Sequence, residues 1–421
     1  MIRFLYTLVL YLSLPFIFLR LLWRSRKLPG LKKNWRQRLG FFNDKLPQSI
    51  WLHAVSVGES IAAIPLLKLL KEKYPDIPII VTNMTATGRE RINAALGNDV
   101  LQSFVPYDIP NFLQRFIKKV NPKIIIVMET EIWPNLFHVC FENKIPIILT
   151  NARLSERSFK GYKRIANVTL QMLNKIKRLV AQTEDDAKRF VELGMSRENI
   201  IVTGNLKFDL EIPQDIFVEA RELKSKVGID RLVWVAASTH EGEEEIILIA
   251  HKKLLERFPD ALLILVPRHP NRFKDVAEKV AKSSFKYSKR SKENKNLNES
   301  EVYLCDTMGE LMLMYAASNI AFVGGSFSKL GGHNMLEPAS LHKPILTGPS
   351  LFNFKLISDL LLESGGMLVV KDSENLVAEL TTLFQDENQR CMMGEKAYNV
   401  IAENKGALLR QFDVISSFIN G

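Results

Sequence analysis

The sequence has few of the features that mark several other classes of protein. It contains only 3 cysteines, Cys140, Cys305 and Cys391, in 421 residues. Their wide spacing fits neither a disulfide framework nor a metal site, and this is typical of a protein in a reducing cytosol. No G-x-G-x-x-G follows an early strand, which disfavours a dinucleotide oxidoreductase. Basic and aromatic residues do not alternate across any domain, so we expect no nucleic-acid partner.

Acidic residues are missing from positions 1–43, which supply most of the net charge of +11. The uncharged run from Phe4 to Leu19 is short of the ~20 residues that a spanning helix usually needs, and no small-x-small cleavage site follows it. We expect residues 1–24 to form a signal anchor or an interfacial helix on an anionic membrane surface, with the body of the protein in the cytoplasm. The basic residues of this stretch are Arg3, Arg20, Arg24, Arg26, Lys27, Lys32, Lys33, Arg36 and Arg38.

From about Ile50 the chain alternates between short apolar runs and helical stretches, which predicts parallel sheets covered by helices. We predict an α/β fold with two Rossmann-like, doubly wound domains that face a cleft, over residues 25–210 and 211–421. The predicted strands are 50–54, 79–82, 124–128, 145–150 and 178–181 in the first domain, and 232–236, 261–266, 301–305, 319–323 and 344–346 in the second. Residues 286–300, rich in lysine and asparagine, are predicted to form a surface loop.

The segment after the strand 319–323 is the most informative about function. Two glycine pairs precede a helix that we expect to begin near Asn334. Glycines at such a turn let backbone amides approach an anion, and a helix N-terminus attracts negative charge. Glu337, one turn into the helix, can accept hydrogen bonds from sugar hydroxyls. A loop that only turns the chain is the alternative, but the pattern GGHN-x-LEP favours a nucleotide-sugar site.

Carboxylates and a lysine follow the predicted strands of the first domain. Glu59, at a helix start, suits a general base, and the helix dipole should hold its pKa down. Glu129, Glu131 and Trp133 suit contact with a carbohydrate, and Lys207 suits a positive charge in the cleft. Each also has a structural alternative. The carboxylates could cap helices, Trp133 could pack between the domains, and Lys207 could lie in a linker turn.

Arginines follow other strands. Arg153 and Arg157 could bind acceptor phosphates, although an ordinary helix start also explains their segment. Arg268, held by Pro267, suits a phosphate clamp, whereas the neighbouring His269 is more typical of a structural histidine.

Three further segments combine hydroxyl and acidic residues. Residues 307–310 and residues 238–241 each match a capping box. The alternatives are a nucleoside site at 307–310 and a site for an acidic sugar donor at 238–241. The acidic residues of 183–186 are best explained by helix capping, and we predict no metal site.

Eight segments appear in one order over nearly the whole chain, and together they are more specific than any one of them. They are HAVSVGES, ETEIWPNL, NARLSERS, TGNLKFD, AASTHEGEEE, VPRHPNRF, DTMGEL and GGHNMLEPA. With them the sequence closely resembles the bacterial 3-deoxy-D-manno-octulosonic acid (Kdo) transferases of lipopolysaccharide assembly. The resemblance implies a GT-B fold and transfer of Kdo from CMP-Kdo to the lipid A precursor (lipid IVA), with inversion and without a metal or other cofactor. It also implies a place on the cytoplasmic face of the bacterial inner membrane.

The resemblance also implies roles for individual residues. Glu59 matches the family's general base, and Glu129 and Lys207 match positions that support the transition state. The segments that bind CMP match Pro267, Arg268, Met308, Gly309, Glu310, Asn334, Met335, Leu336 and Glu337. The alternatives are another membrane-associated GT-B enzyme, such as a UDP-sugar transferase or a nucleotide-sugar epimerase, and a nucleotide-sugar-binding protein without catalysis.

Overall fold

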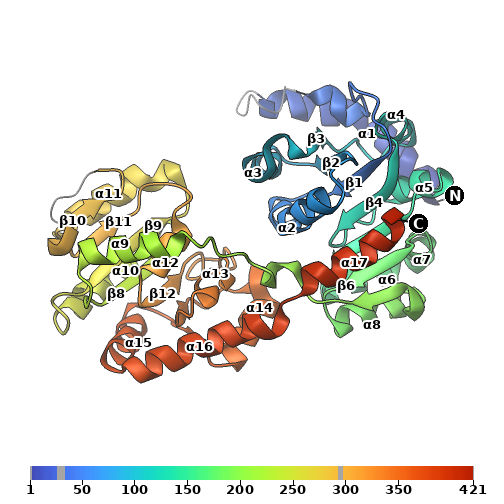
Figure 1. Cartoon of the computed structure of the whole chain (residues 1–421). Helices are drawn as coiled ribbons and strands as arrows, with labels where there is room; N and C mark the ends of the chain where they lie inside the picture. Colours follow the sequence, from blue (N-terminus) through green and yellow to red (C-terminus); the bar gives the residue numbers. More distant parts are fainter. Residues whose placement is uncertain (1, 26–33, 293–296, 421) are drawn as a thin grey trace. The chain divides into compact units, whose positions relative to one another are not determined.

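The structure, a computed structural model, describes residues 2–25, 34–292 and 297–420, so the basic residues Arg26, Lys27, Lys32 and Lys33 lie outside the described part. The chain folds into two compact units (Figure 1). The first comprises Met1–Asp209 with Lys405–Gly421, and the second comprises Leu210–Asn404. Each unit contains a seven-stranded sheet in which every described pairing is parallel.

The sheet of the first unit has the strand order β3-β2-β1-β4-β5-β6-β7. Its strands are β1 (Ser49–His53), β2 (Ile79–Asn83), β3 (Leu101–Phe104), β4 (Pro122–Met128), β5 (Ile147–Ala152), β6 (Arg178–Ala181) and β7 (Ile200–Val202). Its helices are α1 (Ile2–Ser25), α2 (Val57–Lys73), α3 (Ala86–Leu96), α4 (Pro110–Val120), α5 (Pro134–Glu142), α6 (Glu156–Arg164), α7 (Ala166–Leu173), α8 (Glu184–Glu192) and α17 (Ala407–Asn420), with short 3-10 turns η2 (Trp35–Leu39), η3 (Gly97–Asp99), η4 (Arg197–Asn199) and η5 (Leu206–Phe208).

The sheet of the second unit has the order β10-β11-β9-β8-β12-β13-β14. Its strands are β8 (Val233–Thr239), β9 (Leu262–Pro267), β10 (Tyr287–Lys289), β11 (Val302–Leu304), β12 (Ile320–Val323), β13 (Ile345–Thr347) and β14 (Met367–Val369). Its helices are α9 (Ile216–Val227), α10 (Glu243–Leu255), α11 (Phe273–Lys282), α12 (Leu311–Ala316), α13 (Leu336–Ser340), α14 (Lys355–Glu363), α15 (Ser373–Gln385) and α16 (Glu387–Asn404), with 3-10 turns η6 (Pro270–Arg272), η7 (Leu297–Glu299) and η8 (Phe352–Phe354).

Central strands in both sheets are buried along their whole length, as in β1, β8 and β9, or nearly so, as in β4. Helices cover both faces of a parallel sheet, so such strands consist of nearly continuous apolar residues rather than alternating ones. Each sheet packs its two faces into separate apolar clusters, two in each unit. The doubly wound α/β architecture that the sequence predicted is confirmed in both units.

All ten predicted strands are present, and the four that the prediction missed, β3, β7, β10 and β14, are the four edge strands. Edge strands are short and pair on one side only, so the apolar run that marks a central strand is weak in them. β10 and η7 occupy parts of 286–300, so the predicted surface loop there also contains an edge strand and a 3-10 turn, and residues 293–296 of it lie outside the described part.

The C-terminal segment belongs to the first unit, although the sequence prediction assigned all of 211–421 to the second domain. Figure 1 shows α17, in red, among the blue and green elements of the first unit. Its apolar face supplies Ile415 and Ile419 to the core around β1 and β4. The Asp209 carboxylate accepts hydrogen bonds from the amides of Gly406 and Leu408, both at 2.7 Å. Burial of this amphipathic face outweighs proximity along the chain.

Candidate active site

Each sheet has a switch point beside its first strand, where the chain crosses from one half of the sheet to the other. In the first unit this point lies between β1 and β4, and in the second between β8 and β12. Ligands of open α/β sheets bind beyond the carboxyl ends of the strands at such points. Glu59 follows β1, Glu129 follows β4, and the segment 324–337 follows β12, so the main predicted residues lie where the topology favours a site.

Glu59 is a buried carboxylate in the first turn of α2. It forms a capping box with Ser56, whose side chain accepts a hydrogen bond from the Glu59 amide at 3.2 Å. Its own oxygens accept hydrogen bonds from the amides of Val55 at 2.8 Å and Ser56 at 3.2 Å. Glu59 therefore caps α2, the structural role that the sequence left open. Each carboxylate oxygen has a second lone pair, so capping does not prevent proton transfer.

The pKa of Glu59 differs from the sequence-based expectation that the helix start would hold it down. Burial raises the pKa of this carboxyl to about 7, against the hydrogen bonds from Ser56 and Val55. The nearby charges of Glu131 and Glu129 raise it further. Removal of the carboxylate from water outweighs capping. A group with a pKa near neutrality suits a general base at cytoplasmic pH.

Glu129 and Lys207 come together in the first unit. The Lys207 ammonium lies 3.7 Å from Glu129 Oε1, and both side chains are mostly buried. Lys207 is placed by η5, where Asn205 accepts its amide hydrogen at 3.0 Å. Glu129 has a φ of 54°, a conformation that is costly for a residue with a side chain. Such strain at a strand end fits a carboxylate whose direction matters, and Lys207 offsets the negative charge gathered there.

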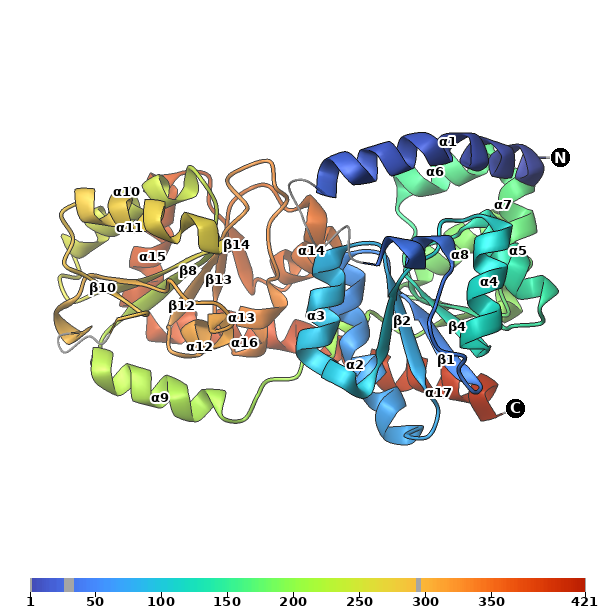
Figure 2. The same cartoon turned by 90° about the horizontal axis from the view of Figure 1, so that it is seen from above.

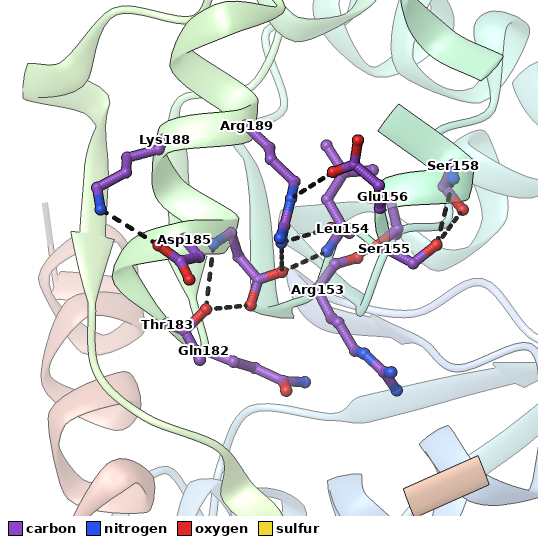
Figure 3. A network of polar contacts seen from close by, with 12 residues as sticks. Arg153, Leu154, Ser155, Glu156, Ser158, Gln182, Thr183, Asp185, Lys188 and Arg189 are labelled. Atoms are coloured by element: carbon purple, nitrogen blue, oxygen red, sulfur yellow. Dashed lines mark hydrogen bonds and ion pairs between the residues drawn. The ribbon is translucent and has the colours of Figure 1, made fainter. Parts of the chain in front are cut away.

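Arg153 extends from the end of β5 on the same sheet edge (Figure 3). The figure shows its side chain directed away from the ion-pair network that surrounds Arg189. In that network the Asp186 carboxylate accepts a hydrogen bond from the Leu154 amide at 2.8 Å and lies 3.5 Å from the Arg189 guanidinium. Thr183 is the N-cap residue of α8, and its side chain accepts a hydrogen bond from the Asp186 amide at 3.1 Å, so capping explains the acidic segment 183–186. Arg157 is exposed on α6, whose ordinary start is capped by Ser155, so Arg153 is the better-placed arginine of the pair.

In the second unit the structure gathers Arg268, Asn334 and Glu337. Asn334 donates to Glu337 Oε1 at 3.1 Å. Burial raises the pKa of Glu337, while that hydrogen bond and the positive charge of Arg268 oppose the rise. Pro267 ends β9, and Arg268 follows it with an exposed side chain. The short helix α13 begins at Leu336, two residues after Asn334 and so close to the predicted start, and Met335 is buried before it.

The glycine-rich segment does not offer its amides in the predicted way. The carboxylate of Glu243 accepts hydrogen bonds from the amides of Gly325 at 2.7 Å and of Ser326 and Phe327 at 2.9 Å. Of the later glycines, Gly331 donates to Ser350 at 3.2 Å and Gly332 to the Gly325 carbonyl at 2.8 Å. These five amides are satisfied inside the unit, so the expectation that they receive a phosphate was wrong. Arg268, whose positive charge acts on Glu337, brings positive charge to this edge.

Residues 307–310 follow β11, the neighbour of β9, and lie at the same edge as Arg268. Glu310 is the N-cap residue of α12, and it accepts hydrogen bonds from Arg290 at 2.9 and 2.6 Å and another from the Thr307 hydroxyl. Thr307 therefore binds a side chain rather than an amide, and the predicted capping box is absent. The second predicted capping box is absent too. Helix α10 begins after Gly242, and the Glu243 carboxylate accepts a hydrogen bond from the His240 amide. Gly309 has a φ of 90° and open space beside it, and Met308 is exposed.

Comparison with known proteins identifies the family. Residues 33–210 match the family model of 3-deoxy-D-manno-octulosonic-acid transferase. The 3-deoxy-D-manno-octulosonic acid transferase of Haemophilus influenzae is 41% identical over 421 residues, covering 99% of both chains. The chain belongs to the 3-deoxy-D-manno-octulosonic acid transferase family. This confirms the predicted family and the predicted glycosyltransferase class.

Solved structures with low sequence identity share the fold of this Kdo transferase. A glycosyltransferase from Rickettsia africae matches with a TM-score of 0.56 at 15% identity, covering 89% of this chain and 99% of its own. The UDP-GlcNAc 2-epimerase of Neisseria meningitidis bound to UDP-GlcNAc matches with a TM-score of 0.57 at 16% identity, covering 86% and 100%. These likenesses confirm the GT-B type of fold and say nothing about activity.

The transferase carries one helix, α1, that is long and apolar enough to cross a membrane, among the residues that the structure describes. Its first turns are hydrogen bonded to the first unit. Arg3 and Thr7 donate to Asn135 Oδ1 at 3.2 and 3.1 Å, and the Tyr6 hydroxyl donates to Asp108 at 3.0 Å. Figures 1 and 2 show α1 lying along the first unit. Its other side exposes apolar residues, among them Phe4, Leu5, Leu8, Leu12, Phe16, Leu19 and Trp23.

Sequence reasoning missed Glu243 and the grouping of three histidines in the second unit. Each of His240, His269 and His333 follows a different strand, and these strands, β8, β9 and β12, are neighbours in the sheet. The available signal was the position of His240 and His269 directly after a strand and of His333 in the loop that follows another strand. Sequence alone could not give the strand order, so His269 was taken as a structural histidine.

Proposed function

We propose that this transferase moves Kdo from CMP-Kdo to a sugar hydroxyl of the lipid A precursor, with Glu59 as the general base. The observation that carries the proposal is the buried Glu59 carboxylate at the switch point between β1 and β4. With a pKa of about 7, a substantial fraction of this group is ionised at neutral pH. Family membership supports Kdo as the transferred sugar.

In the proposed reaction the acceptor oxygen attacks the anomeric carbon of Kdo while its proton passes to Glu59. The bond between that carbon and the phosphate oxygen breaks, and CMP leaves with the electron pair. A single displacement of this kind inverts the anomeric centre. Arg268 stabilises the charge on the departing phosphate, and Glu337, held by Asn334, receives the ribose hydroxyls. The reaction as proposed uses no metal or other cofactor.

The pair of Glu129 and Lys207 has a supporting role in this proposal. Their 3.7 Å contact brings one positive charge to an edge that also holds Glu59 and Glu131. The ammonium limits the repulsion between these carboxylates and an anionic sugar. Arg153, on the same edge, is available for a phosphate of the acceptor.

The proposal places the protein at the cytoplasmic surface of the bacterial inner membrane, with α1 as the contact. The exposed apolar residues of α1 would enter the lipid interface while its first turns stay bound to Asp108 and Asn135. The basic residues near it, including Arg20 and Arg36, favour an anionic leaflet. A helix held in this way lies on the membrane rather than across it.

The decisive experiment replaces Glu59 by Gln, which keeps a side-chain oxygen for the helix cap but removes the base. We expect turnover with CMP-Kdo and lipid A precursor to fall at least about 100-fold, with CMP binding unchanged. Glu72→Gln, at the exposed end of the same helix, is the matched control and should keep wild-type turnover. Turnover of the Glu59 variant within a few-fold of wild type would contradict the proposal.

Competition between free nucleotides separates the remaining alternatives. CMP should inhibit transfer at far lower concentration than UDP. Preferential inhibition by UDP would favour a UDP-sugar enzyme, and CMP binding without any turnover would favour a binding protein.

A further inference from the structure

His240, His269 and His333 form a cluster beside Arg268 in the second unit. The Nε2 atoms of His240 and His333 lie 2.7 Å apart in a hydrogen bond. Their rings are stacked, with centroids 5.0 Å apart and an interplanar angle of 11°. The His269 ring meets His240 edge-on at 5.3 Å between centroids. The cluster thus lies at the carboxyl edge of β8, β9 and β12, where the topology favours a ligand.

Gly325 makes room for this pair. A Cβ atom at Gly325 would lie 2.7 Å from Cδ2 and 2.9 Å from Nε2 of His333, which is too close for any real contact. Its φ of 69° also favours glycine. Gly325 was expected to let a phosphate approach the backbone. In the structure its missing side chain leaves space for the His333 ring, which bonds to His240.

The surroundings of the pair are poor in uncompensated negative charge. The charged and titratable groups that face it are Arg268, His269 and Arg272 from the end of β9 and Glu243 from the start of α10. Glu243 is buried and already accepts four backbone amides, those of His240, Gly325, Ser326 and Phe327. Arg272 is paired with Glu244 at 2.6 and 2.9 Å. Glu337, from the other side, faces Arg268.

The hydrogen bond sets how many protons the pair can hold. In the neutral pair one Nε2 carries a proton and the other accepts it. One further proton can join at Nδ1 of the donating ring without loss of the bond, whereas a second would place two N–H groups against each other. Burial and the charge of Arg268 lower the pKa of His333 to about 4, and burial lowers the pKa of His240. The pair is therefore neutral in the free protein at pH 7.

We propose that His240 and His333, with Arg268, form the subsite for an anionic group of the donor, and that binding of this anion is coupled to uptake of one proton by the histidine pair. The inference rests on the proposed donor, which carries two such groups, the phosphate of CMP and the carboxylate of Kdo. A negative charge beside the pair stabilises its cationic form. The donor then meets a cation that is absent from the empty site, and the product anion is released more readily when the proton leaves.

The test is calorimetric titration of the full-length protein in detergent with CMP, in buffers of different ionisation enthalpy, between pH 6.5 and 8.5. We expect the wild type to take up roughly one more proton per CMP than His333→Asn near pH 6.5. The phosphate of CMP contributes equally in both proteins, so the difference belongs to the pair. The variant should bind CMP about tenfold more weakly at pH 6.5 and nearly as well as wild type at pH 8.5.

Controls separate this coupling from a structural effect. His240→Asn should reproduce His333→Asn, while His342→Asn, on an exposed histidine that binds Glu395, should match the wild type. If the proton enters only when free Kdo is added to the CMP-saturated protein, the anion is the carboxylate. Equal proton counts in wild type and both variants with CMP and Kdo, or an equal affinity loss at every pH, would overturn the inference. Failure of the folded wild type to bind CMP would instead overturn the proposed donor.

Discussion

At the scale of single residues, Glu59 shows two local effects in opposition. Its capping box with Ser56 is the arrangement that its position at the helix start suggests. Capping and the helix dipole favour the charged carboxylate, yet burial and two neighbouring carboxylates favour the neutral acid and raise the pKa to about 7. Burial has the larger effect because it removes the whole side chain from water.

The pH dependence of transfer should report this raised pKa. A base must be deprotonated, so kcat at saturating donor should rise with pH and level off above about pH 7. At pH values below the pKa, on the acid limb of the profile, the rate should fall about tenfold per pH unit. Glu131→Gln removes one like charge and should move the limb to lower pH, because a less negative neighbourhood favours the ionised form of Glu59.

The Glu131 variant keeps an oxygen to accept the 2.8 Å hydrogen bond from Trp133, so the local structure should persist. Glu156→Gln, on the exposed start of α6, is a suitable control and should leave the profile unchanged. An unshifted acid limb in Glu131→Gln would show that another group sets the profile.

At the scale of elements, α1 combines two kinds of surface. One side carries the polar groups that bind Asp108 and Asn135, and the ring of Phe18 meets Trp35 edge-on at 5.9 Å between centroids. Arg3, which binds Asn135, and Phe18 are 15 residues apart along the helix, a length of about 22 Å. The other side is apolar and exposed. These contacts hold the helix along the first unit and support the proposed position on the lipid surface.

Loss of the polar contacts should loosen α1 without making it less apolar. Tyr6→Phe with Thr7→Val removes hydrogen bonds to Asp108 and Asn135, each worth about 1 kcal/mol. We expect amide hydrogen exchange over residues 2–20 to become roughly tenfold faster in the membrane-bound protein. Tyr11→Phe, on the exposed side, should leave exchange unchanged. Unchanged exchange in the double variant would contradict a helix held by these contacts.

At the scale of the whole molecule, the proposed reaction predicts a definite product. Incubation of the purified protein with freshly generated CMP-Kdo and tetra-acylated lipid A precursor should raise the acceptor mass by at least one Kdo residue, read by mass spectrometry. The spectrum also counts the residues added. No gain, with intact donor and folded protein, would point to another donor or to a role without catalysis.

The family, the doubly wound architecture and the central strands follow from the amino-acid sequence alone. Buried strands such as β4 and β9 can be recognised in the sequence because both faces of a parallel sheet are covered, so nearly every position is apolar. The predicted site residues could be placed at strand ends for the same reason. Their catalytic and binding roles stay predictions.

Which groups lie in contact, and whether they are ionised, depends on the packing of distant segments. The edge strands and the return of α17 to the first unit depend on partners distant in sequence. The same holds for the carboxylate of Glu243 on the amides of 325–327, and for the contact between His240 and His333. Local pattern gives the residues at each strand end, but strand order and burial set their neighbours and hence their charge.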